Sequence, residues 1–172
     1  MNENMIVAAA TRVDPTAFRG AMRHVPTPVA IVTTTVRGAP VGLTVGSFTS
    51  VSLEPALVTF FVDKSSTTWP RMQDSDTFTV NILGHGKAER CRTFSGKGVD
   101  RFAGVDWVPS DEGDPIFADA SVVLECIKHS TRWLGDHLQV VGEVTKLHVL
   151  REDLPLVYHQ GAFLNLDHLV SA

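Results

Sequence analysis

VGLTVGSFTSVSLEP, residues 41–55, reads as a strand in its apolar residues but is unusually rich in small polar groups. Two glycines interrupt the run, and a Glu-Pro pair ends it. Hydroxyl side chains occur at five positions: Thr44, Ser47, Thr49, Ser50 and Ser52. Any one of them is explained by the solvated face of an ordinary strand. Glycine inside a strand often marks close approach of a ligand to the backbone, so the cluster would suit the polar edge of a planar heterocycle.

Strand signals continue on both sides of that stretch. PVAIVTTTV (28–36) is β-branched and ends at the turn RGAP (37–40), and ALVTFFVD (56–63) follows the Glu-Pro stop. Because short turns join these runs, they predict antiparallel pairing in a meander. Two further strands, joined by LGD, are expected to close the chain. Outside the meander the predicted strands are TFTVNIL (77–83), ASVVLECIKHSTRW (120–133) and HLQVVGEVTKLHVL (137–150), which together favour a small β-barrel.

Helical signals are short. DPTAFRGAMRHV (14–25) begins with a capping Asp14 followed by proline, and its apolar residues form one stripe. The stripe consists of Phe18, Met22 and Val25. A second short helix, capped by Ser66, is expected within KSSTTWPRMQDSD (64–76), and a third from about Gly86 to Phe94.

The composition is that of an ordinary soluble globular protein, with 44% hydrophobic and 20% charged residues in a chain of 172. We expect a flexible tail over 1–15 and a single domain over 16–172. The net charge of −4 and the pI near 5.9 do not favour nucleic acid or anionic membranes. We find no signal peptide or membrane span and expect a cytoplasmic protein. Cys91 and Cys126 have no zinc-site spacing and are expected to be reduced thiols. None of the seven histidines forms an HxH or HExxH pair, so we expect no metal site.

Three other polar segments could belong to a binding site. DKSSTT (63–68) joins a strand end to a helix start, where backbone N–H groups and a lysine favour phosphate, although a plain cap and turn explains it as well. FSGKGVDRF (94–102) carries two basic residues but also fits an exposed loop. In GDH (135–137) the aspartate could orient the imidazole, or both could be turn residues. The residues alone predict a small soluble β-barrel that could hold a phosphorylated planar ligand.

Taken in order, the segments resemble the flavin reductase family, which supplies reduced flavin to two-component monooxygenases. The resemblance covers about residues 18–163 and rests on FRGAMRHVPTPVAIVTT, GLTVGSFTSVSLEPALVTFFVDKSSTTW, FTVNIL, DRFAGVDW, GDPIFADASVVLEC, GDHLQVVGEV and PLVYHQGAF. It implies a mainly β fold with short helices, a split β-barrel of antiparallel strands that forms a homodimer with flavin near the subunit interface.

The resemblance also implies an activity. The protein would be an NAD(P)H:flavin oxidoreductase that reduces FMN or FAD with NADH or NADPH and passes reduced flavin to a partner oxygenase. Two alternatives remain: a non-catalytic protein that stores or senses flavin, and a β-barrel interaction module without flavin. The choice between FMN and FAD, and between NADH and NADPH, stays open at this point.

By the same resemblance, residues 42–47 would line the isoalloxazine edge, and residues 63–68 and 94–102 would meet the ribityl phosphate. His137 would orient the nicotinamide as the catalytic residue, with Tyr158 nearby; the hydride chemistry itself belongs to the cofactors. The cofactor-binding set is then Gly42, Leu43, Thr44, Val45, Gly46, Ser47, Asp63, Lys64, Ser66, Thr68, Phe94, Ser95, Lys97, Arg101 and Phe102. The chain departs from the family pattern at Pro28, Gly46 and Phe163.

Overall fold

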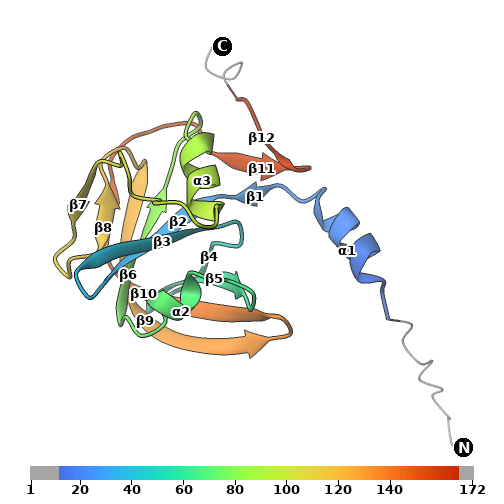
Figure 1. The fold of residues 1–172 in the computed structure, drawn as a ribbon, viewed down its shortest axis with the longest axis horizontal. Helices are drawn as coiled ribbons and strands as arrows, with labels where there is room; N and C mark the ends of the chain where they lie inside the picture. Colours follow the sequence, from blue (N-terminus) through green and yellow to red (C-terminus); the bar gives the residue numbers. More distant parts are fainter. Residues whose placement is uncertain (1–11, 167–172) are drawn as a thin grey trace, which may run out of the picture.

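The computed structural model describes residues 12–166 and shows a β-barrel with one helix standing apart from it (Figure 1). The barrel is a seven-stranded antiparallel sheet with the order β3-β2-β6-β9-β10-β5-β4. The predicted mainly β class and split-barrel fold are therefore confirmed. The predicted tail over 1–15 lies almost wholly outside the described residues. The strands of the sheet are β2 (Ala30–Val36), β3 (Ala39–Val45), β4 (Thr49–Leu53), β5 (Ala56–Asp63), β6 (Thr77–Ile82), β9 (Val122–Leu134) and β10 (His137–Val149).

The hairpins of this sheet follow the turn signals in the sequence. Arg37 and Gly38, both with positive φ, form the tight turn between β2 and β3, as the RGAP signal predicts. Glu54 and Pro55 form the turn between β4 and β5, because Leu53 pairs with Ala56. The long β9 and β10 also pair with each other across their short turn.

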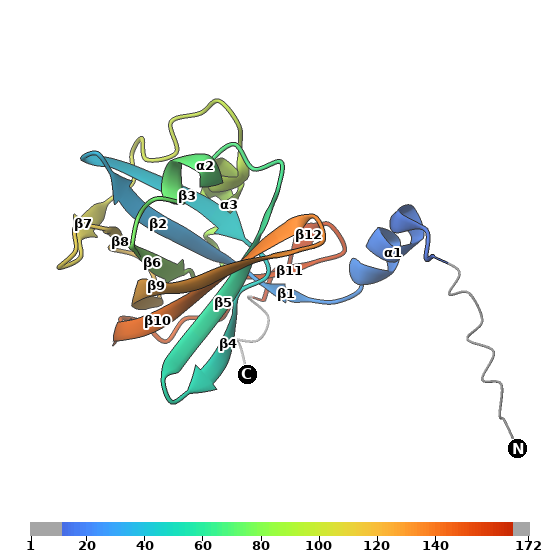
Figure 2. The same cartoon turned by 90° about the horizontal axis from the view of Figure 1, so that it is seen from below.

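The predicted meander is wrong in one respect, because the single run expected over 41–55 is divided between two strands, β3 and β4, that pair with different neighbours. The two strands are the opposite edges of the sheet, and the stretch 41–55 leaves the sheet at Gly46 before it re-enters at Thr49. Figure 2 shows the β4–β5 hairpin extending away from the β2–β3 hairpin. The half-buried Phe48 packs against the barrel core, which draws the connection across one end of the barrel. The curled sheet brings β3 against β5, and the line where these two strands meet is called the seam here.

The sequence analysis missed five short strands. A hairpin of β7 (Trp107–Pro109) and β8 (Pro115–Phe117) lies beside the barrel, and β11 and β12 follow the strands that were expected to close the chain. They form a three-stranded sheet with the order β1-β11-β12, built from β1 (Thr27–Pro28), β11 (Val157–His159) and β12 (Ala162–Phe163). Segments of two or three residues are too short to show the alternation that identifies a strand.

The three predicted helices are present as α1 (Pro15–Met22), α2 (Trp69–Met72) and α3 (Ala88–Ser95). Asp14 caps α1 by accepting a hydrogen bond from the backbone N–H of Ala17 at 2.8 Å. The N-cap residue of α2 is Thr68 and not the predicted Ser66, although Ser66 Oγ accepts hydrogen bonds from the backbone N–H groups of Thr68 and Trp69 at 3.3 and 3.2 Å. Both views show α1 projecting away from the barrel (Figures 1 and 2), and none of its residues is buried.

Two hydrophobic clusters hold the barrel together. One fills its interior, where the ring of Phe60 meets the edges of Trp69 and Phe78. The other packs α3 against the outer face of the sheet through Phe94 and Phe117. Burying rings of this size is the main stabilising contribution in such a fold, and it fixes α3 beside β3.

Candidate flavin site

The largest cavity of the described residues, about 980 Å³, opens at the seam. The end of β3 and the turn after it form one wall, and the end of β5 with the segment leading into α2 forms another. The structure brings most of the predicted flavin-binding residues together here: Leu43, Thr44, Val45, Gly46, Ser47, Asp63, Ser66, Thr68, Phe94, Ser95, Lys97 and Arg101. His137 also lines this cavity.

Four predicted residues lie elsewhere. Gly42 and Phe102 line a smaller neighbouring cavity of about 270 Å³, and Lys64 is exposed and lines neither of these cavities. Tyr158 lines a third cavity of about 520 Å³, which shares Thr44, Gly46 and Ser95 with the largest one. The structure thus places His137 and Tyr158 in adjoining cavities, not in one.

Gly42 has a structural reason to be glycine. A Cβ at this position would lie 2.9 Å from a ring carbon of Phe94 and 2.9 Å from the methyl group of Thr33. The close approach that the sequence suggested therefore comes from α3 and β2, not from a ligand. Gly46 is more open, since the nearest atom to its Cβ position is the Thr27 hydroxyl at 3.5 Å.

The hydroxyls of 44–52 divide into two groups. Thr44 donates to the Cys91 carbonyl at 2.7 Å, which ties β3 to α3. Ser47 accepts from the Phe61 N–H at 2.9 Å and donates to the Phe61 carbonyl at 3.3 Å, so one side chain replaces a ladder pair across the seam. Thr49, Ser50 and Ser52 lie on the edge strand β4 and line none of the three cavities described above.

The segment 63–68 contains one group that disfavours a bound anion and another that favours it. Asp63 accepts from the Ser65 backbone N–H at 2.6 Å, and hydrogen bonds from the backbone and side chain of Ser65 hold the pKa of the Asp63 carboxyl below its usual range. This carboxylate disfavours an anion beside it. The hydroxyl of Thr68, the exposed ammonium group of Lys97 and the guanidinium of Arg101 also line this cavity and favour an anion.

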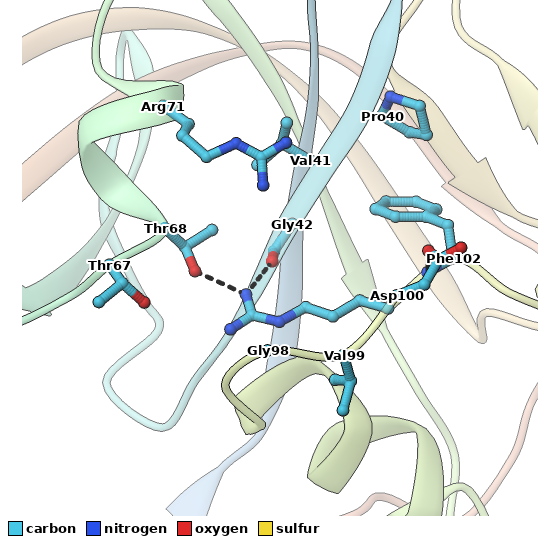
Figure 3. A pocket seen from close by; sticks show the side chains of 11 residues that line it. Pro40, Val41, Gly42, Thr67, Thr68, Arg71, Gly98, Val99, Asp100 and Phe102 are labelled. Atoms are coloured by element: carbon cyan, nitrogen blue, oxygen red, sulfur yellow. Dashed lines mark hydrogen bonds between the residues drawn. The ribbon is translucent and has the colours of Figure 1, made fainter.

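Arg101 forms the partition between the largest cavity and its smaller neighbour. Its Nη1 donates to the Gly42 carbonyl at 2.6 Å and to the Thr68 hydroxyl at 2.7 Å (Figure 3). Its Nε donates to the Gly96 carbonyl at 3.2 Å. Burial and the nearby charge of Arg71 lower the pKa of Arg101. Arg101 thus joins the loop 96–102 to β3 and to the segment before α2.

His137 begins β10, where it pairs with Asp63 of β5 and Leu134 of β9. Its Nδ1 lies 2.7 Å from Asp136 Oδ1, and this hydrogen bond lowers the pKa of Asp136. A carboxylate on Nδ1 orients the ring and leaves Nε2 without this bond, which agrees with the first of the two interpretations that the sequence left open for the GDH turn.

Sequence reasoning missed several residues of the largest cavity: Phe18, Met22, Phe61, Val62, Ser65, Thr67 and Leu134. Phe61 and Val62 precede the predicted Asp63 on β5, and Leu134 precedes the GDH turn, so these three could have been included for their position. Phe18 and Met22 were predicted as an apolar stripe, but 58% and 46% of their surfaces are exposed. Only the three-dimensional arrangement connects that stripe with the cavity.

Residues 12–166 contain neither a cluster of metal-binding side chains nor a helix that could span a membrane. Within this range no group of three or more His, Cys, Asp or Glu side chains could hold a metal ion. None of the helices described is both long and apolar enough to cross a bilayer.

Comparison with known proteins gives consistent matches. Residues 22–167 match the model of the flavin reductase like domain. A flavin reductase of Pseudomonas putida is 40% identical over 152 residues, covering 88% of this chain and 89% of its own. The reductase subunit HsaB of a flavin-dependent monooxygenase from Rhodococcus jostii is 36% identical, covering 92% and 82%. The NADH:FAD oxidoreductase SgcE6 of Streptomyces globisporus superposes with a TM-score of 0.82 at 36% identity, covering 91% and 97%.

Proposed function

Because this chain belongs to the flavin reductase like domain family, we propose that the cavity at the seam binds the flavin that the protein reduces. The protein is an NAD(P)H:flavin oxidoreductase, with FMN or FAD as acceptor and NADH or NADPH as donor. Its function is to supply reduced flavin to a partner monooxygenase.

The observation that carries the binding proposal is the composition of the cavity. Apolar walls from Leu43, Val45 and Phe61 face a rim of hydroxyl and charged groups. This combination suits a planar ring system with one polar edge and an anionic tail. The volume, about 980 Å³, is at the upper end of the roughly 300–1,000 Å³ of ligand pockets, so it has room for a flavin and part of a second nucleotide.

Hydride transfer from the reduced nicotinamide to the flavin is chemistry that the two nucleotides supply. The residues of the chain bind and orient. Thr44 has already used its only donor on Cys91, so toward a ligand its hydroxyl can only accept, for example from a ring N–H. His137, held by Asp136, offers Nε2 to the nicotinamide nucleotide and fixes its position relative to the flavin.

We also propose that the protein is a homodimer and that the partner subunit completes the flavin site. The edge strand β4 is unpaired on one side and carries Leu53, which is 90% exposed. On β10, Leu147 and Val149 are each 64% exposed. Exposed apolar residues beside an open strand edge favour pairing with a second copy. We place this dimer in the cytoplasm, where the nicotinamide donors are available.

Absorbance at 340 nm tests the activity directly. Purified protein should oxidise NADH or NADPH only when FMN or FAD is added, and flavin should quench its tryptophan fluorescence. Flavin binding without nucleotide oxidation would replace the reductase with a storage or sensing protein. Absence of both binding and oxidation would reject a flavin function altogether.

A further inference from the structure

A second, smaller cavity lies directly beside the flavin cavity. Pro40, Val41 and Gly42 of β3, the start of α2, and the loop 98–102 enclose about 270 Å³ (Figure 3). Thr67, Thr68 and Arg101 line both cavities, so the two spaces adjoin at this wall. The smaller one is below the roughly 300–1,000 Å³ of a whole-ligand pocket, so it suits one part of a ligand that begins next door.

Arg71 is the group of this cavity whose side chain has no bonding partner among residues 12–166. In Figure 3 it extends from α2 toward β3, over the space bounded by Thr68 and Gly42. Within residues 12–166 the structure gives its guanidinium no hydrogen bond and no ion pair. The one carboxylate in the lining, Asp100, accepts instead from the Phe102 N–H at 3.1 Å. Five guanidinium donors are therefore available to an acceptor that enters the cavity.

Arg101 adds a second positive charge to the same space. Its bonds to Gly42, Thr68 and Gly96 fix it in the partition, so it cannot move away from Arg71. The charge of Arg71 lowers the pKa of Arg101, so the two guanidinium groups repel each other, and an anion between them would relieve that repulsion. The Thr68 hydroxyl accepts from Arg101 and keeps its own proton for such an anion.

We propose that this cavity binds the adenylate phosphate of FAD and that Arg71 makes the protein prefer FAD to FMN. The inference rests on the proposed flavin site. FMN has one phosphate, whereas in FAD a second phosphate follows it directly and must continue beyond the flavin cavity. The shared wall of Thr67, Thr68 and Arg101 is where the two cavities meet, and a guanidinium can bind a phosphate through two parallel hydrogen bonds.

Fluorescence titrations with FMN, FAD and riboflavin, on the wild type and three variants, test the proposal. Wild type should bind FAD more tightly than FMN. Arg71→Ala should weaken FAD binding about tenfold, the effect of losing one charged hydrogen-bonded contact, and change FMN binding less than twofold. Arg71→Lys should recover part of the FAD affinity. Arg151→Ala removes an exposed arginine that follows β10 and lines neither cavity, and it should change neither affinity.

Three results would overturn the inference. Equal losses for FMN and FAD would mean that Arg71 acts on the phosphate common to both or on the fold, which thermal melting of the variant separates. Unchanged FAD affinity would remove Arg71 from the site. A loss confined to the KM of NADPH, with NADH unaffected, would assign the cavity to a phosphate of the donor. A failure of the proposed function would give a different result, because the wild-type protein would then bind neither FMN nor FAD.

Discussion

The side-chain hydroxyl of Thr44 donates a hydrogen bond to the backbone carbonyl of Cys91 at 2.7 Å. The bond joins the edge strand β3 to the helix that covers it, at the wall of the flavin cavity. The same carbonyl accepts from the Ser95 hydroxyl at 2.8 Å, so it would keep a partner if Thr44 lost its hydroxyl. A substitution of Thr44 can therefore change flavin binding while it has little effect on the stability of the fold.

We expect Thr44→Val, which keeps the shape and removes the hydroxyl, to raise the Kd for flavin several-fold. The loss of stability should be small, about 0.5–1.5 kcal/mol, because Cys91 keeps its bond from Ser95. Flavin titration and urea denaturation measure the two effects. Thr49→Val on β4 is the matched control and should leave flavin binding unchanged. A Thr44→Val variant with wild-type affinity would show that this hydroxyl does not contact flavin.

Ser47→Ala should weaken both the barrel seam and flavin binding. The substitution leaves the Phe61 N–H and carbonyl without the side chain that bonds them, at a cost of about 1–3 kcal/mol. The urea midpoint should fall, and the flavin Kd should rise because the wall of the cavity is no longer held. Ser52→Ala, on the far edge strand, should do neither. An unchanged midpoint for Ser47→Ala would mean that the seam does not need this bridge.

His137→Ala should slow flavin reduction by NADH roughly tenfold or more, since a poorly positioned donor loses rate steeply. Flavin affinity should change less than twofold, because our proposal assigns the imidazole to the donor and not to the flavin. Stopped-flow reduction together with flavin titration separates the two. Asp136→Asn should give a smaller loss of rate, because it removes the charge that orients the ring. Parallel losses in binding and rate would instead make His137 a structural turn residue.

Both cysteines should be unreactive in the folded protein. Burial raises the pKa of Cys91 and of Cys126 to about 12, from an ordinary value of 9.0, so at pH 8 almost no thiolate is present. The folded state thus holds these protons more tightly than the unfolded chain. This stabilisation is complete below about pH 9 and is lost as the pH rises toward 12. Ellman's reagent should label two thiols in urea and almost none without it; rapid native labelling would contradict the burial.

The homodimer should depend on the exposed edge of the barrel. We expect Leu53→Glu on β4 to shift the sedimentation of the protein toward monomer and to weaken FMN binding, because the partner completes the site. Val108→Glu on β7, which is also exposed, is the control and should leave the assembly intact. Added FMN should raise the Tm of the wild type, since our proposal has it bind only the assembled form. A wild-type monomer that binds FMN with undiminished affinity would refute the proposal.

Local signals in the sequence were sufficient to predict most strands and hairpins of the barrel. The β2–β3 hairpin follows from the Arg37-Gly38 turn, and the β9–β10 hairpin from the turn at Gly135 and Asp136. The separation of β3 from β4 could not be read in the same way. It depends on Phe48 entering the core and on the curling of the whole sheet, which no local pattern encodes.

The residues of the candidate site also fall into those that local sequence signals predict and those that depend on the folded arrangement. Segments that contribute consecutive residues, such as 43–47 and 63–68, were predicted because a strand end concentrates its polar groups. Gly42 was assigned to flavin on a correct principle, but the group that approaches it is Phe94 of α3. Arg71 was missed because nothing in its neighbourhood distinguishes it from any exposed arginine of a short helix. Its position relative to Arg101 appears only when the loop 96–102 is folded over β3.

The order of strands in the sheet also has a consequence for the speed of folding. β2 lies against β6, β6 against β9, and β5 against β10, so almost every pairing outside the hairpins joins parts of the chain that are far apart in sequence. Closing such long loops costs entropy before any contact repays it, and chains of this kind fold slowly for their length. The walls of the flavin cavity come from β3 and β5, which meet only when the sheet has curled. The chain therefore cannot hold a flavin until nearly all of its long-range pairings have formed.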